Sequence, residues 1–380
     1  MKISWACSLS AATTLLAPVW TQPALLAPAP GSPITVAGGP GNIVLGDVNE
    51  DGKPDLIVAS GQSRAITVWL GRGNGQFRSG PKSPIRVPDS PGELALGDLN
   101  GDGELDLAIA SHDSYGVWLL FGDGLGYFAL ATNSPIVMKD GQHPHTHGLE
   151  LGDLNGDGKL DLITVNNEDS DLSLAFGDGR GRFVRSSSSS LAVGRSPYPL
   201  AVGDLNADGR LDIVSTSTAF TSRALTVLMG DGKVGFRRSD VTVRTPRPWF
   251  VSIGDVNGDR HPDLVATHSE SSPLTVLLGD GRGGFREASA SPFDLGHSAW
   301  GIALADMNGD GKIDVVAAAS DGVRVMLGDG RGNFNPAPGS PFPTGKGAWR
   351  LAVGDLNGDG KPDVATSDSE GDSVSVLLAH

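Results

Sequence analysis

The sequence is poor in cysteine, in basic residues and in amphipathic helical patterns. Its single cysteine, Cys7, lies in the N-terminal segment, so a disulfide framework is excluded for the rest of the chain. Its 29 lysines and arginines oppose 44 aspartates and glutamates, and the net charge of −15 argues against nucleic-acid binding, which requires a basic stripe. Aromatic residues make up only 6% of the chain, whereas 54 of its 380 residues are glycine. This composition indicates many short strands joined by tight turns.

The acidic residues gather in a nine-residue pattern, D-x-N-x-D-G-x-x-D, which occurs six times in full and once with a change at the glycine. Successive copies start 49 to 55 residues apart, at Asp47, Asp98, Asp153, Asp204, Asp255, Asp306 and Asp355. A fixed period of about 50 residues is typical of propellers and solenoid arrays. The recurring aspartates of the seven copies make up 21 of the 44 acidic residues, so about half of the acidity of the chain belongs to this loop.

Each loop presents side-chain oxygens at alternating positions around a tight turn, which suits a hard cation with six to eight oxygen ligands. Glycine at the sixth position supplies the positive φ that such a bend requires. Three aspartates within nine residues repel one another unless a cation lies between them, although a recurrent Asx turn without an ion is the alternative. We therefore predict up to seven calcium ions, held by Asp47, Asn49, Asp51 and Asp55; Asp98, Asn100, Asp102 and Asp106; Asp153, Asn155, Asp157 and Asp161; Asp204, Asn206, Asp208 and Asp212; Asp255, Asn257, Asp259 and Asp263; Asp306, Asn308, Asp310 and Asp314; and Asp355, Asn357, Asp359 and Asp363.

Each repeat contains four strand-like runs. In the second repeat these are 93–97, 107–110, 117–121 and 134–138, with the acidic loop between the first two. Short strands at this spacing predict an all-β fold, a seven-bladed β-propeller of four-stranded antiparallel blades. The repeats lie near 41–88, 92–138, 147–193, 198–244, 249–295, 300–344 and 349–380.

The two ends of the chain predict how the ring closes. The last repeat stops after its third run, 374–378. The sequence SPITV at 32–36, which precedes the first repeat, resembles the fourth runs SPIRV at 83–87 and SPIVM at 134–138. We therefore predict that the N-terminal strand, 32–37, completes the last blade and places Ile34 beside Val376, because such closure removes exposed sheet edges.

The N-terminal segment has the features of an export signal. Lys2 precedes a mostly apolar stretch, 3–17, which Pro18 ends, and small residues follow at Ala24 and Ala27. The apolar stretch is shorter than the roughly 20 residues of a membrane span, so we do not expect an integral membrane protein. We assign 1–27 to a signal peptide, 28–31 to a linker and 32–380 to the propeller, in a protein that is secreted, periplasmic or at the cell surface.

Glycine-rich turns at 122–126, 177–181 and 279–283 lack the following helix that a phosphate-binding loop needs. Each is followed instead by an aromatic residue, Phe128, Phe183 or Phe285. We predict hairpin turns whose aromatic side chains pack between blades.

The acidic loop, placed after a hydrophobic strand that usually ends in glycine, resembles the FG-GAP / VCBS repeat family, whose seven-bladed propeller forms the head of integrin α-subunits. The resemblance covers about residues 32–380. It implies calcium between the first and second strands of each blade, and a partner bound on the opposite face of the ring.

Two departures from the family pattern affect the expected metal sites. Arg260 replaces glycine at the bend of the fifth loop, where positive φ is strained, so we predict the weakest calcium site at 255–263. Asparagine occupies the second ligand position of every loop, and fewer charges favour weak affinity, with a Kd of roughly 10⁻⁴–10⁻³ M. Ala305, which replaces the glycine before Asp306, is expected to be harmless.

The position six residues before each first aspartate begins the innermost strand, so we expect these residues at the mouth of the central channel. Flat rings are good platforms for sugars or for protein hot spots, although they could simply wedge between inner strands. The seven residues are Gly41, Gly92, His147, Tyr198, Trp249, Trp300 and Trp349, of which the last five carry rings. His143, His145 and His147 alternate, and in an extended chain they could bind a transition metal.

We therefore expect a monomeric, exported, non-catalytic binding or adhesion module for a glycan or an extracellular protein, with calcium in a structural role. The alternatives are a structural envelope scaffold, or an enzyme acting on polysaccharides as a lyase or hydrolase at the channel mouth. A hydrolase needs two carboxylates that face one pocket. Its candidates are the turn residues Glu168, Asp169, Glu270 and Asp321.

Overall fold

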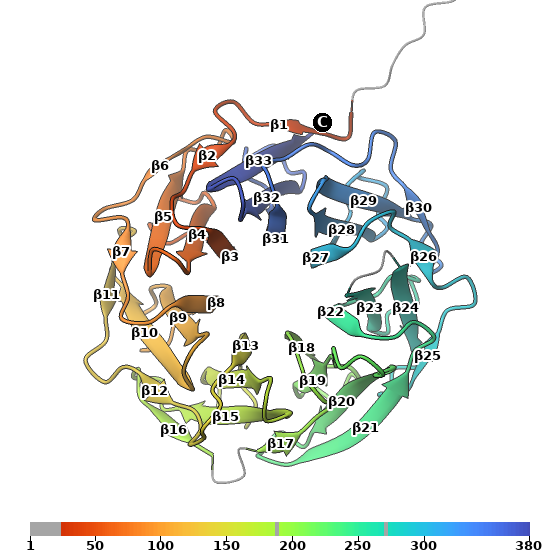
Figure 1. Cartoon of the computed structure of the whole chain (residues 1–380), viewed down its shortest axis with the longest axis horizontal. Coiled ribbons are helices and arrows are strands. Elements are labelled where there is room, and N and C mark those ends of the chain that lie inside the picture. Colours follow the sequence, from red (N-terminus) through yellow and green to blue (C-terminus); the bar gives the residue numbers. More distant parts are fainter. Residues whose placement is uncertain (1–23, 187–189, 270–272) are drawn as a thin grey trace, which may run out of the picture.

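The computed structural model describes residues 24–186, 190–269 and 273–380. These residues form seven antiparallel sheets arranged around a central axis, which confirms the predicted all-β, seven-bladed propeller (Figure 1). Across the described residues, no helix has the length and apolar character needed to cross a membrane. The predicted signal segment falls outside the described residues up to position 23.

Three strands of each blade run from the channel outwards. The first and innermost strands are β3 (Pro40–Gly46), β8 (Pro91–Gly97), β13 (Thr146–Gly152), β18 (Leu200–Gly203), β22 (Pro248–Gly254), β27 (Ala299–Ala305) and β31 (Ala348–Gly354). The second strands are β4 (Asp55–Ser60), β9 (Asp106–Ser111), β14 (Asp161–Asn166), β19 (Asp212–Ser215), β23 (Asp263–His268), β28 (Asp314–Ala319) and β32 (Asp363–Asp368). The third strands are β5 (Ala65–Gly71), β10 (Gly116–Gly122), β15 (Asp171–Gly177), β20 (Ala224–Gly230), β24 (Pro273–Gly279), β29 (Gly322–Gly328) and β33 (Ser373–Ala379).

The outermost strand is continuous only in the fourth blade, where it is β21 (Phe236–Thr242). In five blades it consists of two short pieces that pair with opposite ends of the third strand. These pairs are β6 (Phe77–Ser79) and β7 (Ile85–Arg86), β11 (Phe128–Leu130) and β12 (Ile136–Val137), β16 (Phe183–Arg185) and β17 (Leu191–Ala192), β25 (Phe285–Glu287) and β26 (Phe293–Asp294), and β1 (Leu26–Pro28) and β2 (Ile34–Thr35). In the sixth blade β30 (Phe334–Pro336) is followed by a single bridge between Val323 and Phe342.

The N-terminal segment closes the ring, as predicted, but the closing strand starts earlier. Both β1 and β2 pair with β33 of the last blade (Figure 1). Leu26 and Ala27, which were assigned to the signal peptide, and Pro28, which was assigned to the linker, form β1 and pair with Leu377–Ala379. The register also differs by two residues from the prediction, because Ile34 lies opposite Val374. Closure therefore uses two strand pieces.

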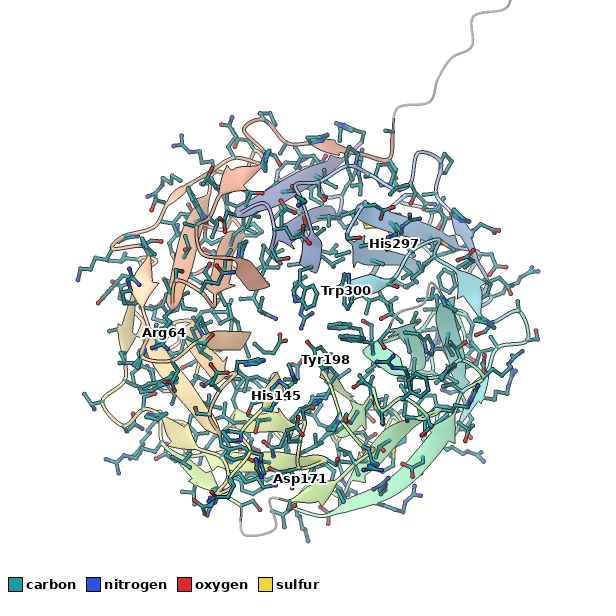
Figure 2. The ribbon with its side chains drawn as sticks, in the orientation of Figure 1. Arg64, His145, Asp171, Tyr198, His297 and Trp300 are labelled. Atoms are coloured by element: carbon teal, nitrogen blue, oxygen red, sulfur yellow. The ribbon has the colours of Figure 1, made fainter. Side chains whose placement is uncertain are left out.

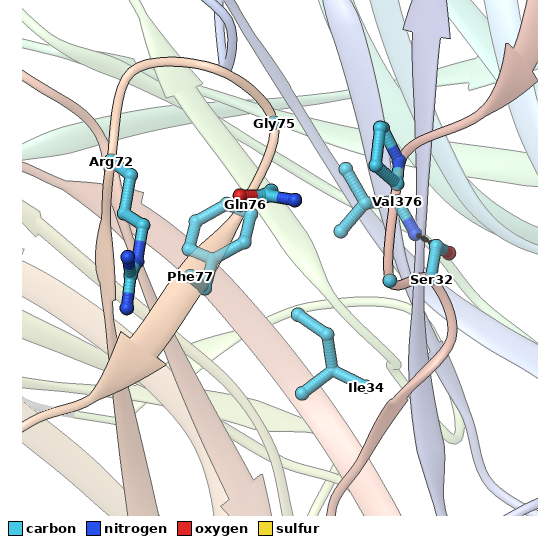
Figure 3. A pocket seen from close by; sticks show the side chains of 9 residues that line it. Ser32, Ile34, Arg72, Gly75, Gln76, Phe77 and Val376 are labelled. Carbon is cyan, nitrogen blue, oxygen red and sulfur yellow. Dashed lines mark hydrogen bonds between the residues drawn. The ribbon is translucent and has the colours of Figure 1, made fainter.

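The closing seam is fixed by side chains as well as by strand pairing. The backbone N–H of Val376 donates to Oγ of Ser32 at 2.8 Å, and Phe77 of the first blade lies across the seam from Ile34 (Figure 3). The seam leaves a cavity of about 360 Å³ between the last and first blades.

The core is divided into seven apolar clusters, and each lies between two neighbouring blades. The second strands are buried along their whole length, because both of their faces contact an adjacent blade. The aromatic residues after the hairpin turns join these clusters, as predicted: Phe128, Phe183 and Phe285 each pack in a different one. Among the described residues, each of these clusters draws on two blades, so neighbouring blades depend on each other for burial.

Candidate functional site

The predicted calcium loops connect the first and second strands of all seven blades and share one hydrogen-bond pattern. In the first loop, Oδ2 of Asp47 accepts from the Gly52 N–H, Oδ1 of Asn49 from the Asp51 N–H, and Oδ1 of Asp51 from the Lys53 N–H. The equivalent bonds occur in the other six loops at 2.7–3.0 Å. The predicted ligand side chains therefore fold inward over their own loop backbone.

The last aspartate of each loop has a structural role that the sequence analysis missed. In the third blade, both oxygens of the buried Asp161 are used: Oδ2 accepts from the Leu154 N–H and Oδ1 from the Gly177 N–H, each at 2.9 Å. The same two bonds occur in every blade, at Asp55, Asp106, Asp212, Asp263, Asp314 and Asp363. This carboxylate connects the loop, the second strand and the end of the third strand.

In six blades the third strand ends in a glycine that lies close to the loop backbone. A Cβ on Gly177 would lie 2.2 Å from the backbone oxygen of Leu160, just before Asp161. A side chain at Gly177 would therefore force the local backbone to shift, although in the last blade Ala379 makes the equivalent bond to Asp363.

Burial of the last aspartates raises their pKa. For Asp55, Asp106, Asp161 and Asp263 the pKa is raised to about 6, chiefly by desolvation and further by the charges of the first and second aspartates of the same loop. The backbone hydrogen bonds oppose this shift without cancelling it. The three carboxylates of a loop thus lie close enough to repel one another.

Two positions of every loop have left-handed backbone, whereas the sequence analysis predicted one. The sixth position is glycine in six loops, and Arg260 adopts φ 69° in the fifth, as predicted. The fourth position is also left-handed, and it is not always glycine, since Glu50 has φ 54° and Ala207 has φ 60°. The first and fourth loops therefore also contain a strained residue.

The rings predicted at the channel mouth meet one another. Centroids of neighbouring rings lie 4.3–5.0 Å apart along a chain from His147 through Tyr198, Trp249 and Trp300 to Trp349. We call these five residues the aromatic arc. His145, Tyr198 and Trp300 point towards the centre of the ring (Figure 2). Gly41 and Gly92 occupy the equivalent positions of the first two blades and leave the arc open there.

Bulges at the start of the innermost strands help to position the arc. The pairing register between first and second strands shifts near the mouth in six of the seven blades. A bulge re-aims the side chains beside it. Two successive residues of a strand, such as Trp349 and Arg350, can therefore both reach the channel.

An ion pair that the sequence analysis missed crosses the channel below the arc. Arg350 of the last blade, whose exposed fraction is 7%, binds Oε1 of Glu93 in the second blade at 2.6 Å and donates to the Trp300 backbone oxygen at 2.8 Å. Its guanidinium lies 4.4 Å from the ring centroid of Phe250. Asn42 donates to the other oxygen of Glu93. Residues of five blades are thus connected through this ion pair.

The gap in the arc forms a pocket of about 180 Å³, which we call the mouth pocket. His147, Tyr198 and Trp349 form its walls, and Arg350 and Glu93 lie at its base. A larger cavity of about 500 Å³ continues along the channel and shares Asn42, Glu93 and Arg350 with the mouth pocket, so the ion pair separates the two. Glu150 lines this inner cavity, and burial raises its pKa to about 7.

The family described as FG-GAP-like repeat matches five overlapping segments, which together cover residues 47–215 and 255–366. The chain belongs to the FG-GAP-like repeat family. No curated protein matches it.

Several solved structures share the propeller fold of this FG-GAP chain. A lectin from Agrocybe aegerita, described as recognising non-reducing terminal N-acetylglucosamine, is 20% identical with a TM-score of 0.58, over 79% of this chain and 80% of the lectin. BBS1N, in complex with ARL6DN, is 12% identical with a TM-score of 0.66, over 94% and 98%. Virginiamycin B lyase from Staphylococcus aureus is 10% identical with a TM-score of 0.58, over 92% and 98%. At these identities the comparisons establish the fold alone.

The histidines of the FG-GAP propeller group differently from the prediction. The described residues hold one group of three His, Cys, Asp or Glu side chains whose ligand atoms all lie within 4.8 Å, and it consists of His112, His145 and His147. His112 belongs to the turn between β9 and β10, so sequence alternation could not reveal it, and His143 is not in the group. The charges of His145, His112 and Arg350, together with burial as the largest cause, lower the pKa of His147 to about 3.

The carboxylates considered for hydrolysis have separate partners. Asp169 accepts from the Tyr115 hydroxyl at 2.5 Å and pairs with Lys139, whereas Asp321 pairs with Arg324 in the sixth blade. Glu168 lies 3.4 Å from Nδ1 of His145. Glu270 lies outside the described residues.

Proposed function

We propose that this FG-GAP propeller is an exported, calcium-stabilised, non-catalytic module that binds a glycan in the mouth pocket. The observation that carries the proposal is a small pocket walled by flat rings with polar groups at its base. Pockets of this composition suit sugars, because apolar ring faces stack on aromatic side chains while hydroxyls meet polar groups.

The polar groups of the mouth pocket are not fully satisfied by the protein. Within the described part of the chain, the buried Oδ1 of Asn42 accepts no hydrogen bond, although Asn42 lines the pocket. A buried acceptor of this kind is costly unless something donates to it. A sugar hydroxyl in the pocket would supply that donor. The lectin described above supports the proposal, since a protein of similar fold is described as recognising a sugar.

Calcium has a structural role in this proposal. The donor set of each loop is made of carboxylate and amide oxygens, which suit a hard cation, and the mutual repulsion of its three aspartates would be relieved by one. The loops lie at the far ends of the innermost strands from the mouth pocket. Calcium would therefore fix blade geometry without contacting the glycan.

Export is the third part of the proposal, and we infer the cleavage position from the packing of β1. Leu26 is 2% exposed and packs between the last two blades, with Leu25 beside it. Cleavage after Ala27 would remove part of β1, so we place the cleavage before Leu25. N-terminal sequencing of the exported protein tests this position.

Glycan-array screening of the calcium-loaded protein, followed by calorimetry with the best glycan, tests the binding function. Removing an aromatic hot spot costs about 2 kcal/mol, so Trp349→Ala should weaken binding about 30-fold. Tyr127→Ala is the control, because Tyr127 lies in the hairpin turn after β10, away from the mouth pocket. Equal affinity of wild type and Trp349→Ala would contradict the pocket assignment. If the protein binds a protein ligand that carries no glycan, the proposal that its ligand is a glycan is wrong.

A further inference from the structure

Three histidines from two blades converge beside the mouth pocket. His112 lies in the turn after β9, and His145 and His147 lie at the start of β13. The ring centroid of His112 lies 4.8 Å from that of His145 and 5.1 Å from that of His147. The centroids of His145 and His147 are 4.2 Å apart. His112 and His145 are 33 positions apart in the sequence, and the packing of neighbouring blades brings them together.

The nitrogen atoms of the group are spaced as a single metal ion requires. All three ligand nitrogens lie within 4.8 Å of one another, and Nε2 of His145 lies 2.8 Å from Nε2 of His147. Zinc–nitrogen bonds of about 2.0–2.1 Å in a tetrahedral site place ligand nitrogens about 3.3 Å apart, which falls between these two values. Small rotations of the imidazole rings would therefore suffice.

A carboxylate lies beside the Nδ1 atom of two of the three histidines. Oδ1 of Asp113 lies 2.8 Å from Nδ1 of His112, and Oε1 of Glu168 lies 3.4 Å from Nδ1 of His145. Metal-binding histidines commonly donate their second N–H to a carboxylate, which fixes the tautomer and leaves the other nitrogen for the ion. The arrangement therefore resembles a prepared site more than a chance cluster of surface histidines.

We propose that His112, His145 and His147 bind one divalent transition metal ion, with zinc as the best fit. Imidazole ligands favour such ions, whereas calcium prefers oxygen, so this site is chemically distinct from the seven acidic loops. His112 and His147 both line the mouth pocket. The fourth coordination position therefore opens towards the pocket and is available to water or to an oxygen of a bound ligand. The proposal stands independently of the glycan assignment.

Zinc calorimetry tests the proposal on protein made without a histidine tag and kept saturated with calcium, so that the acidic loops do not contribute. We expect one zinc ion per chain, and Co²⁺ should give a visible absorption spectrum with nitrogen ligands. His112→Gln and His147→Gln should abolish both signals while the calcium-dependent melting temperature is retained. Asp113→Asn should weaken zinc binding about 10–100-fold, as losing an outer carboxylate does.

His297→Gln is the matched control, because His297 is an exposed histidine just before β27 of another blade. It should leave the zinc stoichiometry and the Co²⁺ spectrum unchanged. Zinc binding that persists in His112→Gln and His147→Gln, or no zinc binding by wild type, would overturn the proposal. Where a variant melts early, the Co²⁺ spectrum of the wild-type protein decides the ligand type.

Discussion

Arg260 is the residue at which one acidic loop departs from the other six. It keeps the common hydrogen-bond pattern, but with a side chain at φ 69°, where the other loops have glycine. Left-handed backbone costs a residue other than glycine at least about 1 kcal/mol. We expect Arg260→Gly to raise the unfolding free energy of the calcium-loaded protein by about 1 kcal/mol, measured by urea denaturation.

The reciprocal substitution in the next blade is the control. Gly311 has φ 80°, and a Cβ there would have no neighbour within 4 Å, so Gly311→Arg introduces backbone strain without a clash. It should lower the unfolding free energy by a similar amount. If both substitutions leave it unchanged, the strain account of the fifth loop is wrong.

His268 gives the fold a pH dependence that does not involve the metal sites. It is fully buried, with Nδ1 2.9 Å from the Pro246 backbone oxygen and Nε2 2.8 Å from the Thr275 hydroxyl. Burial lowers its pKa to about 4 from an ordinary value of 6.5. The unfolded chain therefore binds a proton first as the pH falls, and the neutral form contributes stability only above that range.

We expect the stability contributed by His268 to be complete above about pH 7 and to be lost between pH 6.5 and 4, by about 3 kcal/mol at most. His268→Gln keeps a polar side chain that does not titrate there. The difference in unfolding free energy between wild type and this variant should shrink across that window. A difference that stays constant from pH 7 to 4 would show that the pKa of His268 is not lowered.

Residues that act within one loop could be predicted from the sequence, whereas residues that act across blades could not. The ligand positions of an acidic loop are contiguous, so the pattern alone identifies them. Arg350 and Glu93 are separated by 257 positions and meet only because the ring brings their blades together. His112 joins His145 for the same reason. Periodicity identifies the blade of each residue, but not which side chains meet at the axis.

At the scale of the strand, the last aspartate of each loop is the main structural connection. In the third blade, Asp161→Ala would leave two buried N–H groups without acceptors, at about 1–3 kcal/mol each. We therefore expect it to lower the unfolding free energy by about 2–5 kcal/mol even in the presence of a chelator. Thermal and urea unfolding in EGTA measures the effect.

Asp157→Ala in the same loop is the comparison, because Asp157 is exposed and the acceptor bond it would lose lies at the surface. In EGTA this variant should be close to wild type, since it also removes repulsion between carboxylates. Equal destabilisation by the two substitutions would mean that Asp161 contributes nothing beyond the loop itself.

The outer strands were predicted less well than the inner ones. The SPIVM run identified the second piece of the outer strand in the second blade, β12, whereas at the first piece, β11, only the packing of Phe128 after a hairpin turn was predicted. Residues 131–135 separate the two pieces. Short, exposed outer pieces show weak periodicity, whereas second strands are buried on both faces and give continuous apolar runs.

At the scale of the whole molecule, closure of the ring was predictable from two features of the sequence. The last repeat lacks a fourth strand-like run, and a run of that type, 32–36, precedes the first repeat. The start of the closing strand was not predictable, since an apolar stretch near the N-terminus resembles a signal peptide as much as a strand. Leu26, Ala29 and Val36 are all at most 4% exposed and pack against the last blade or its neighbours.

Removing the closing segment should therefore destabilise the propeller strongly. Deletion of residues 1–36 removes three buried apolar side chains and exposes the apolar surface they cover and the edge of β33, at a cost of about 5 kcal/mol, with increased self-association. Deletion of residues 1–23 alone is the control and should melt like the full chain. Thermal unfolding with light scattering measures both effects, and equal melting of the two deletions would contradict the closure described above.

The measurement that tests the account most directly is calcium titration of chelator-treated protein by calorimetry, paired with thermal unfolding. With a Kd of about 1 mM, each occupied loop contributes about 1.4 kcal/mol at about 10 mM calcium. We predict several calcium ions per chain, up to seven, and a melting temperature that rises with calcium. No heat of binding, together with identical melting in EGTA and in calcium, would contradict the assignment of the acidic loops.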